Sequence, residues 1–213
     1  MQSSLGYILR TRPYSDANVI VDVFTKDAGR ITCMARPAKL RGKVQKGHLQ
    51  SFRILQLDWQ GRGEMLSLKQ TDERFRHRIP VSSLLYGLYL NELILRLIPL
   101  HTSLETLFSD YQNSLQLLVE SAAPMTVVMR FEMALMEGLG HPLSLWYDDE
   151  DGSEIKLGQR YLYSVGAGVL RYDSSQPQTA GVLITAELLM ALREPSKMGL
   201  PELQRQSACR EPC

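Results

Sequence analysis

The sequence predicts an α+β protein, in which a small five-stranded antiparallel barrel is followed by a mainly α-helical domain. Apolar residues alternate in short segments over about the first 72 positions and recur at helical spacing from about residue 84. The charge divides at the same place, since residues 1–80 hold 15 Lys and Arg against 7 Asp and Glu, whereas residues 81–213 hold 9 against 16. We therefore expect a basic domain at 1–79 and an acidic, helical domain at 80–213.

The strands of the barrel are expected in chain order, separated by turn signals. A turn at 26–29 ends in Gly29, which can adopt a positive φ, and a second turn at 60–63 is rich in glycine. The apolar phase flips inside the fourth segment, as in a long strand that bends through a bulge. Such a barrel is most typical of the oligonucleotide-binding (OB) type, and a small SH3-like barrel is the alternative. The expected strands are 5–9, 17–23, 31–35, 49–59 and 65–70.

Helices are expected after Pro80. The segment 84–98 is apolar on nearly all sides, which predicts a helix inside a bundle. Residues 102–105 match a capping box before a second helix, and Pro124 suits the first turn of a third. Residues 143–180 are irregular, with short pieces that could form small strands, before Thr185 caps one more helix.

Composition and motifs argue against a membrane protein, a metalloprotein and the common enzyme classes. No apolar run reaches the roughly 18 residues of a membrane span, and no secretory signal begins the chain, so we expect a cytoplasmic protein. The three cysteines and four histidines lack metal-ligand spacing, and nucleotide-binding or hydrolase fingerprints are absent. The acidic run 148–151 is interpreted as a solvated turn. We expect no cofactor, no metal and no catalytic residue.

The basic segment 28–57 carries the strongest functional signal, because it contains seven Lys and Arg and not one acidic residue. Long cationic side chains beside a barrel bind phosphates with little sequence preference, whereas a merely solvated loop usually mixes both charges. We therefore expect these cations to lie together on one exposed side and to bind nucleic acid. They are Arg30, Arg36, Lys39, Arg41, Lys43, Lys46 and Arg53.

Further candidates lie nearby. Arg12 and Arg62, together with Arg10, would extend the basic surface. Tyr14, beside a proline turn, is the best platform for stacking an unpaired base. Three other aromatic residues of the barrel are expected in the core instead: Tyr7, Phe24 and Phe52.

Arg130 stands out in the third expected helix, next to Phe131. It could receive a carboxylate of a partner peptide in an apolar groove, or form an internal ion pair. The residues alone leave these alternatives open, and the candidate internal partners are Glu92, Glu132 and Glu137.

Five segments, taken in order, resemble the bacterial recombination-mediator family RecO. They are RPYSD at 12–16, VFTKDAGR at 23–30, QGRGE at 60–64, YLNEL at 89–93 and RFEMAL at 130–135. The resemblance covers residues 1 to about 195 and implies an N-terminal OB-fold, a helical domain and no enzymatic site. RecO-like proteins bind single- and double-stranded DNA, anneal complementary strands, and with RecR help RecA to replace the single-stranded-DNA-binding protein SSB.

The resemblance implies roles for two parts of this chain. The loop 36–46 would meet DNA in a nucleoid-associated protein, and Arg130 would hold the acidic tail of SSB. Two departures from the family pattern are notable. Residues 143–172 lack the four cysteines with which some members bind zinc, which is typical of the zinc-free branch, and the ending at 204–213 looks truncated or altered.

The sequence thus favours a non-enzymatic mediator of DNA repair and recombination. A protein-interaction adaptor with a peptide-binding barrel, or an RNA-binding OB module, are the alternatives. The salt dependence of DNA binding separates the mediator from the adaptor. Competition between RNA and single-stranded DNA separates it from the RNA-binding module.

Overall fold

The structure is a computed structural model that describes residues 1–37, 46–121, 123–164, 166–173 and 181–193, with Lys46 described by its backbone alone. The chain forms two compact units, Met1–Phe131 and Glu132–Cys213. The first compact unit therefore contains the first two helices as well as the barrel. The sequence pattern instead changes at residue 80, where the spacing of apolar residues becomes helical.

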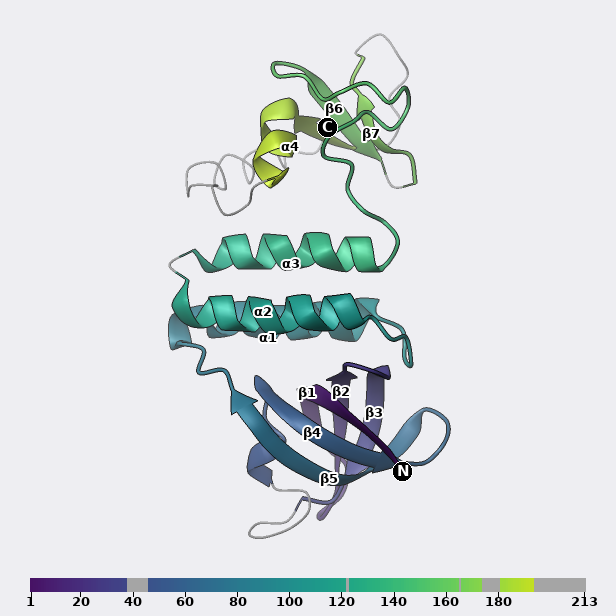
Figure 1. Ribbon diagram of the computed structural model, residues 1–213, viewed down its shortest axis with the longest axis vertical. Helices are drawn as coiled ribbons and strands as arrows, with labels where there is room; N and C mark the ends of the chain where they lie inside the picture. The colour runs from purple at the N-terminus through teal and green to yellow at the C-terminus, as the bar shows by residue number, and fades with distance from the viewer. Residues whose placement is uncertain (38–45, 122, 165, 174–180, 194–213) are drawn as a thin grey trace. The chain divides into compact units, whose positions relative to one another are not determined.

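A closed five-stranded barrel of OB type forms the first part of the chain, as predicted (Figure 1). The strands follow the order β1-β2-β3-β5-β4, and β4 pairs with β1 to close the barrel. A single turn of 3₁₀-helix, η1 (Lys46–His48), precedes β4. The strands are β1 (Gln2–Pro13), β2 (Val19–Thr25), β3 (Gly29–Ala35), β4 (Arg53–Gln60) and β5 (Met65–Arg76).

The barrel is mixed and not purely antiparallel, which corrects the prediction. β3 pairs with β5 in parallel, with Thr32 opposite Met65 and Met34 opposite Ser67. Tight turns determine the direction only of strands that follow one another in the chain. β3 and β5 are separated by β4, so the closure of the barrel decides their direction.

The predicted bend in the fourth strand is confirmed. The pairing of β4 with β5 shifts register between Ile54 and Leu55, and again between Asp58 and Trp59. Because of the first shift, Arg53, Ile54 and Leu55 are buried in succession. The interior of the barrel is filled by apolar side chains that include Ile8, Val21, Val23, Ile31, Cys33, Leu57 and Trp59.

Two helices, α1 (Val81–Leu97) and α2 (Glu105–Glu120), lie over one end of the barrel (Figure 1). Aromatic rings form the contact, with the ring centroid of Tyr7 5.6 Å from Phe108 and 5.1 Å from Tyr111. The Tyr111 hydroxyl donates to Oδ1 of Asn91, whose Nδ2 donates to the Leu9 carbonyl at 3.0 Å. The middle of β1, from Tyr7 to Leu9, is therefore buried on both faces, by the barrel interior and by the helices.

α1 is not enclosed on all sides by the described residues, which corrects the expectation of a helix inside a bundle. Leu90 and Ile94 are fully buried, whereas Val81 and Leu85, on the opposite face, are 88% and 76% exposed. The reason is that α1 packs against the barrel and α2 on one side only.

The predicted capping box does not form. α2 begins after Leu104, which makes no side-chain cap hydrogen bond. Glu105, which the box places at the third helical position, is the first residue of α2, so Thr102 lies too early in the chain to cap the helix. The neighbouring Ser103 donates its hydroxyl to the carbonyl oxygen of Lys26, in the turn between β2 and β3.

α3 (Pro124–Gly138) begins at Pro124 and ends at Gly138, as predicted. Beyond it the second unit contains three short strands in the order β7-β6-β8 and a final helix. Thr185 caps that helix, since its Oγ1 accepts a hydrogen bond from Leu188 N at 3.3 Å. The elements are β6 (Arg160–Ser164), β7 (Gly168–Arg171), β8 (Val182–Thr185) and α4 (Ala186–Arg193).

The acidic run 148–151 is not simply a solvated turn. Asp148 is 2% exposed, and its carboxylate accepts hydrogen bonds from the backbone N–H groups of Glu150 and Arg171. Asp149 accepts one from Val169 N at 2.8 Å. These carboxylates hold β7 in place, because a buried backbone N–H needs an acceptor.

No helix in the described ranges is long and apolar enough to cross a membrane.

Candidate nucleic-acid interface

The outer face of β1, β2 and β3 carries a compact group of polar and apolar side chains. Side chains alternate between the two faces of a strand, so those that point away from the barrel interior are two positions apart. The pairing of the strands then places them in two rows across the sheet. The rows are Arg10, Asp22 and Thr32, and Arg12, Ile20 and Met34.

Two loops flank this face. OB-folds bind oligonucleotides on the face of β2 and β3, between the loops that follow β1 and β4. In this chain those loops are 14–18 and 61–64, and they contain Tyr14 and Arg62. The structure therefore places two predicted site residues beside the face that this fold uses for nucleic acid.

The Tyr14 ring is 63% exposed, as a stacking platform requires. Its loop is held by hydrogen bonds from the backbone N–H groups of Tyr14 and Ser15 to the carbonyl oxygen of Asn18, both at 3.1 Å. The three other candidate aromatics, Tyr7, Phe24 and Phe52, are buried, which confirms the prediction that they belong to the core.

Asp22 organises the centre of the face. Its side chain is 3% exposed, and it accepts hydrogen bonds from Arg10 Nε and Thr32 Oγ1, both at 3.0 Å. Nη2 of Arg12 lies 3.3 Å from Oδ2 of the same carboxylate. The Arg10 and Arg12 side chains remain 47% and 48% exposed, so both guanidinium groups still reach solvent.

The seven cations of 28–57 do not all lie together in exposed positions, which corrects that expectation. Arg53 is buried and forms an ion pair with Glu73 of β5. Arg30 is partly buried, and its Nε donates to the carbonyl oxygen of Ile98 at 2.7 Å. Acidic residues outside the segment approach it in space, because neighbouring strands come from distant parts of the chain.

Arg36 and Arg62 are exposed, and neither forms an ion pair with another described residue. Lys39, Arg41 and Lys43 lie outside the described residues, and Lys46 is placed only by its backbone in η1.

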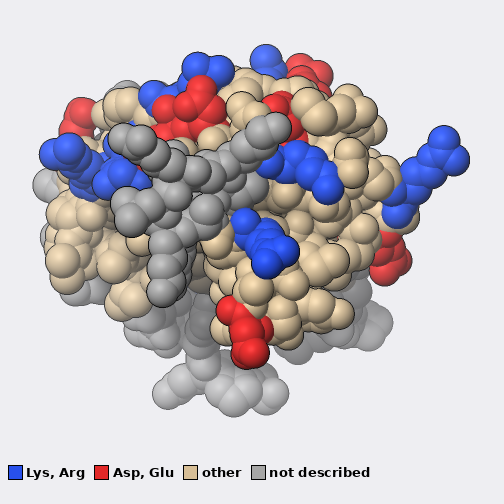
Figure 2. Space-filling view, turned by 90° about the horizontal axis from the view of Figure 1, so that it is seen from below, with Lys and Arg blue, Asp and Glu red and all other residues tan. Residues whose placement is uncertain are grey.

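Figure 2 shows the barrel end opposite α1 and α2, where Lys and Arg side chains are interspersed with Asp and Glu. The described side chains at this end therefore do not form a surface of one charge.

Arg130 is exposed on α3. Glu92, one of its candidate internal partners, forms an ion pair with Arg96 instead. The exposed position is compatible with the predicted contact with a partner's carboxylate, and that contact remains a prediction.

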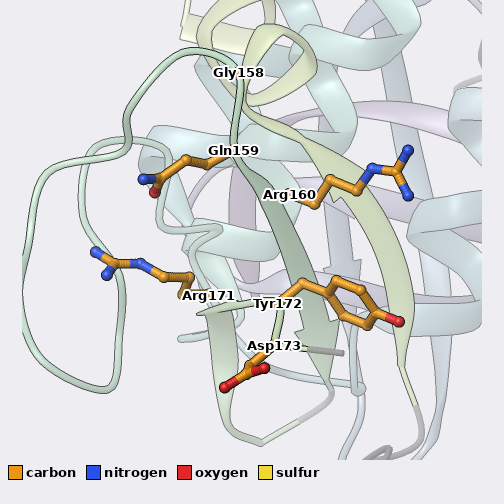
Figure 3. A pocket seen from close by; sticks show the side chains of 6 residues that line it. All are labelled: Gly158, Gln159, Arg160, Arg171, Tyr172 and Asp173. Atoms are coloured by element: carbon orange, nitrogen blue, oxygen red, sulfur yellow. The ribbon is translucent and has the colours of Figure 1, made fainter. Parts of the chain in front are cut away.

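An open pocket of about 480 Å³ lies at the edge of β6 and β7 in the second unit (Figure 3). Its two arginines, Arg160 and Arg171, point to opposite sides, so they do not converge on one anion. Nη2 of Arg171 also donates to Ser153 Oγ at 3.0 Å.

Within the described ranges, no three His, Cys, Asp or Glu residues come together as metal ligands.

The sequence analysis did not predict that Asp22 would bind the arginines of this face. Part of the signal was present, since Arg10 and Arg12 are two positions apart, and Asp22 lies between the apolar Val21 and Val23, so it points away from their face. The register of the β1–β2 pair was needed to bring the three together.

Comparison with known families agrees with the fold. Residues 1–73 match the family model described as "Recombination protein O N terminal", and residues 81–211 match "Recombination protein O C terminal". The chain belongs to the RecO family. The resemblance noted in the sequence is thereby confirmed, and the family is one of DNA repair proteins.

Curated RecO relatives match over most of the chain. The DNA repair protein RecO of Nitrosococcus oceani is 34% identical over 200 residues, which are 91% of this chain and 80% of the relative. RecO of Proteus mirabilis is 35% identical over 168 residues, 78% of this chain and 68% of the relative. For RecO of Cupriavidus metallidurans the identity is 33% over 186 residues, 86% of this chain and 62% of the relative.

Proposed function

We propose that this RecO-family chain is a non-enzymatic mediator of DNA repair and recombination. It binds single- and double-stranded DNA through the barrel, anneals complementary strands, and helps to load RecA onto DNA covered by SSB. The observation that carries the proposal is the exposed arginine face of an OB barrel, flanked by the loops of Tyr14 and Arg62, in a chain of this DNA repair family.

The DNA contacts combine phosphate binding with stacking. Exposed Arg and Lys side chains neutralise phosphates, and Tyr14 stacks on an unpaired base. Arg30 contributes through the guanidinium nitrogens that its bond to Ile98 leaves available. The proposed residues are Arg12, Tyr14, Arg30, Arg36, Lys39, Arg41, Lys43, Lys46 and Arg62.

Annealing follows from charge neutralisation without any chemical step. Two complementary strands repel each other through their phosphates, and a protein that releases their counterions lowers this barrier. The same surface that binds one strand can therefore promote pairing with another.

The protein partners engage the helical part of the chain. Arg130, exposed on α3, holds a carboxylate of the acidic SSB tail in a charge-assisted hydrogen bond. RecR and, indirectly, RecA are the further partners of the same pathway of DNA repair.

DNA binding is tested with a fluorescein-labelled single strand, by anisotropy across a series of salt concentrations. Replacement of Lys39, Arg41 and Lys43 by Glu is expected to abolish binding while the thermal unfolding curve stays unchanged. Reversal of Lys156, Arg160 and Arg171 in the second unit is the matched control, since it changes the net charge equally. Undiminished affinity of the loop variant at low salt would remove the proposed surface.

The partner contact has its own test. Arg130→Ala is expected to weaken binding of a labelled acidic peptide that ends in a free carboxylate, with no change in DNA affinity. Equal peptide binding by the two proteins would contradict the role of Arg130. A weak salt dependence of DNA binding would favour the adaptor alternative, and preference for RNA over single-stranded DNA would favour the RNA-binding module.

A further inference from the structure

The buried carboxylate of Asp22 holds two arginines in defined positions. Nε and Nη2 of Arg10 both lie 3.0 Å from Oδ2, and Nη2 of Arg12 lies 3.3 Å from the same atom. Thr32 Oγ1 donates to the other oxygen, Oδ1, at 3.0 Å. Three neighbouring strands thus contribute to one polar cluster, and the carboxylate cannot turn without losing hydrogen bonds from each side.

This cluster carries one net positive charge, because two guanidinium groups share a single carboxylate. A buried carboxylate is normally neutralised by one cation, so the second arginine exceeds what burial requires. Each guanidinium group has five N–H donors, and Asp22 uses only a minority of them. The other donors belong to side chains that are 47% and 48% exposed, so they are accessible to an anion from solvent.

The surroundings suit a nucleotide and not an isolated anion. In the adjacent row, Ile20 and Met34 lie directly beside Arg12 and continue across β2 and β3. Met34 is 36% exposed, so part of its apolar surface is open to a ligand. A backbone phosphate at the arginines would therefore leave the attached base over an apolar surface.

We propose that Arg10 and Arg12 form a preformed clamp for one phosphodiester of a single strand, with Asp22 as the positioning residue and with Ile20 and Met34 under the adjoining base. This proposal rests on the proposed function, since it assigns a phosphate subsite within the same barrel face. The geometry of this clamp is set before DNA arrives, so ordering two long side chains costs little at binding.

The first test replaces each arginine and measures the affinity for a labelled single strand at several salt concentrations. Arg10→Gln and Arg12→Gln are each expected to weaken binding about tenfold, as for the loss of a charge-assisted hydrogen bond. The log-log salt slope should fall by about 0.7 for the lost phosphate contact. Arg96→Gln is the matched control, since it removes an arginine from the ion pair with Glu92, on α1.

Asp22→Asn separates positioning from charge. Removal of a negative charge should strengthen DNA binding if only the electrostatic field matters, whereas a positioning role predicts weaker binding despite the additional positive charge. Should Asp22→Asn fail to fold, as judged by its thermal unfolding curve, the pair Arg10→Lys and Arg12→Lys decides instead. Lysine keeps the charge and loses the planar fork, so weaker binding supports the clamp.

The outcomes distinguish this proposal from the proposed function. If the wild-type chain binds with a steep salt dependence and the arginine variants bind equally well, the clamp is wrong and the DNA-binding function stands. If the wild-type chain does not bind a single strand at all, both are wrong. Tighter binding by Asp22→Asn would likewise overturn the positioning role.

Discussion

The hydroxyl of Tyr7 lies 3.0 Å from Nε2 of His77, and this pair joins β1 to the residue that follows β5. Both side chains are buried among aromatic rings, with the Phe75 ring centroid 5.1 Å from that of His77. No described residue pairs with Nδ1 of His77 within hydrogen-bonding geometry. A charge on this imidazole would therefore lie in an apolar site without a carboxylate contact.

Burial lowers the pKa of His77, and a hydrogen-bonding contribution from Gln116 opposes this only in part. The unfolded chain then binds more protons than the folded chain below the ordinary histidine pKa of about 6.5. The stability that neutral His77 provides is therefore present above about pH 6.5 and is lost as the pH falls towards the folded-state pKa.

We expect His77→Gln to flatten the dependence of the free energy of unfolding on pH between about 7.5 and 5, because one histidine contributes at most about 1.4 kcal/mol per pH unit. Urea unfolding measures this at each pH, followed by tryptophan fluorescence in a Trp146→Phe background so that only the buried Trp59 contributes. The exposed His141 supplies the control, and His141→Gln should keep the wild-type slope. An unchanged slope for His77→Gln would contradict the assignment.

Gly29 permits the contact between the β2–β3 turn and the segment before α2. Its φ is +66°, and a Cβ atom there would lie 1.9 Å from the carbonyl oxygen of Thr102. Backbone cannot move aside as a flexible side chain can, so Gly29→Ala should destabilise the barrel unit by about 3 kcal/mol or more. Gly63 has φ +83° and open space around it, so Gly63→Ala should cost only about 1 kcal/mol. Chemical denaturation of both variants measures the difference, and equal losses would refute the steric explanation.

Arg30 and Arg36 should respond differently to the same substitution. Arg30→Gln removes the hydrogen bond to Ile98 and should lower the free energy of unfolding by about 1–2 kcal/mol. Arg36 is exposed, so Arg36→Gln should leave stability within about 0.5 kcal/mol of the wild type and weaken DNA binding. Denaturation and DNA anisotropy on the same samples check both statements. A stable Arg30→Gln protein would show that this bond contributes little.

Cys33 should be unreactive in the folded chain. Burial raises the pKa of its thiol to about 12, and the charge of Asp22 adds to the increase. In a chain with Cys209 and Cys213 replaced by Ser, a thiol reagent at pH 8 should label Cys33 only after urea is added, since the thiolate is the reactive form. Rapid labelling without urea, at a rate matching that of a small thiol, would show that the barrel opens at this position.

The local features of the fold were predictable because neighbouring residues decide them. Gly29 in its turn, the bulge near Ile54 and the start of α3 at Pro124 all follow from the conformational limits of a few consecutive residues. The exposed Tyr14 was predictable for the same reason, since its loop lies beside a proline. The family resemblance was also carried by short segments read in order.

Features that depend on distant residues were predicted incorrectly or missed. Arg53 does not carry an unopposed charge, because β5 brings Glu73 beside it. α2 begins at Glu105, two residues later than a cap at Thr102 predicts. The apolar pattern of α1 could not reveal that Val81 and Leu85 stay exposed in the described structure, since periodicity shows which side chains are apolar and not what lies beside them.

The sequence by itself determined the order and type of the elements, the basic character of the barrel half and the membership of a DNA repair family. Only the tertiary structure decided the parallel closure of β3 on β5 and the partners of each arginine. The physical reason is that turns and periodicity act over a few residues, whereas Asp22 meets Arg10 and Arg12 through the register between strands. That register also decides which positive charges can reach a phosphate.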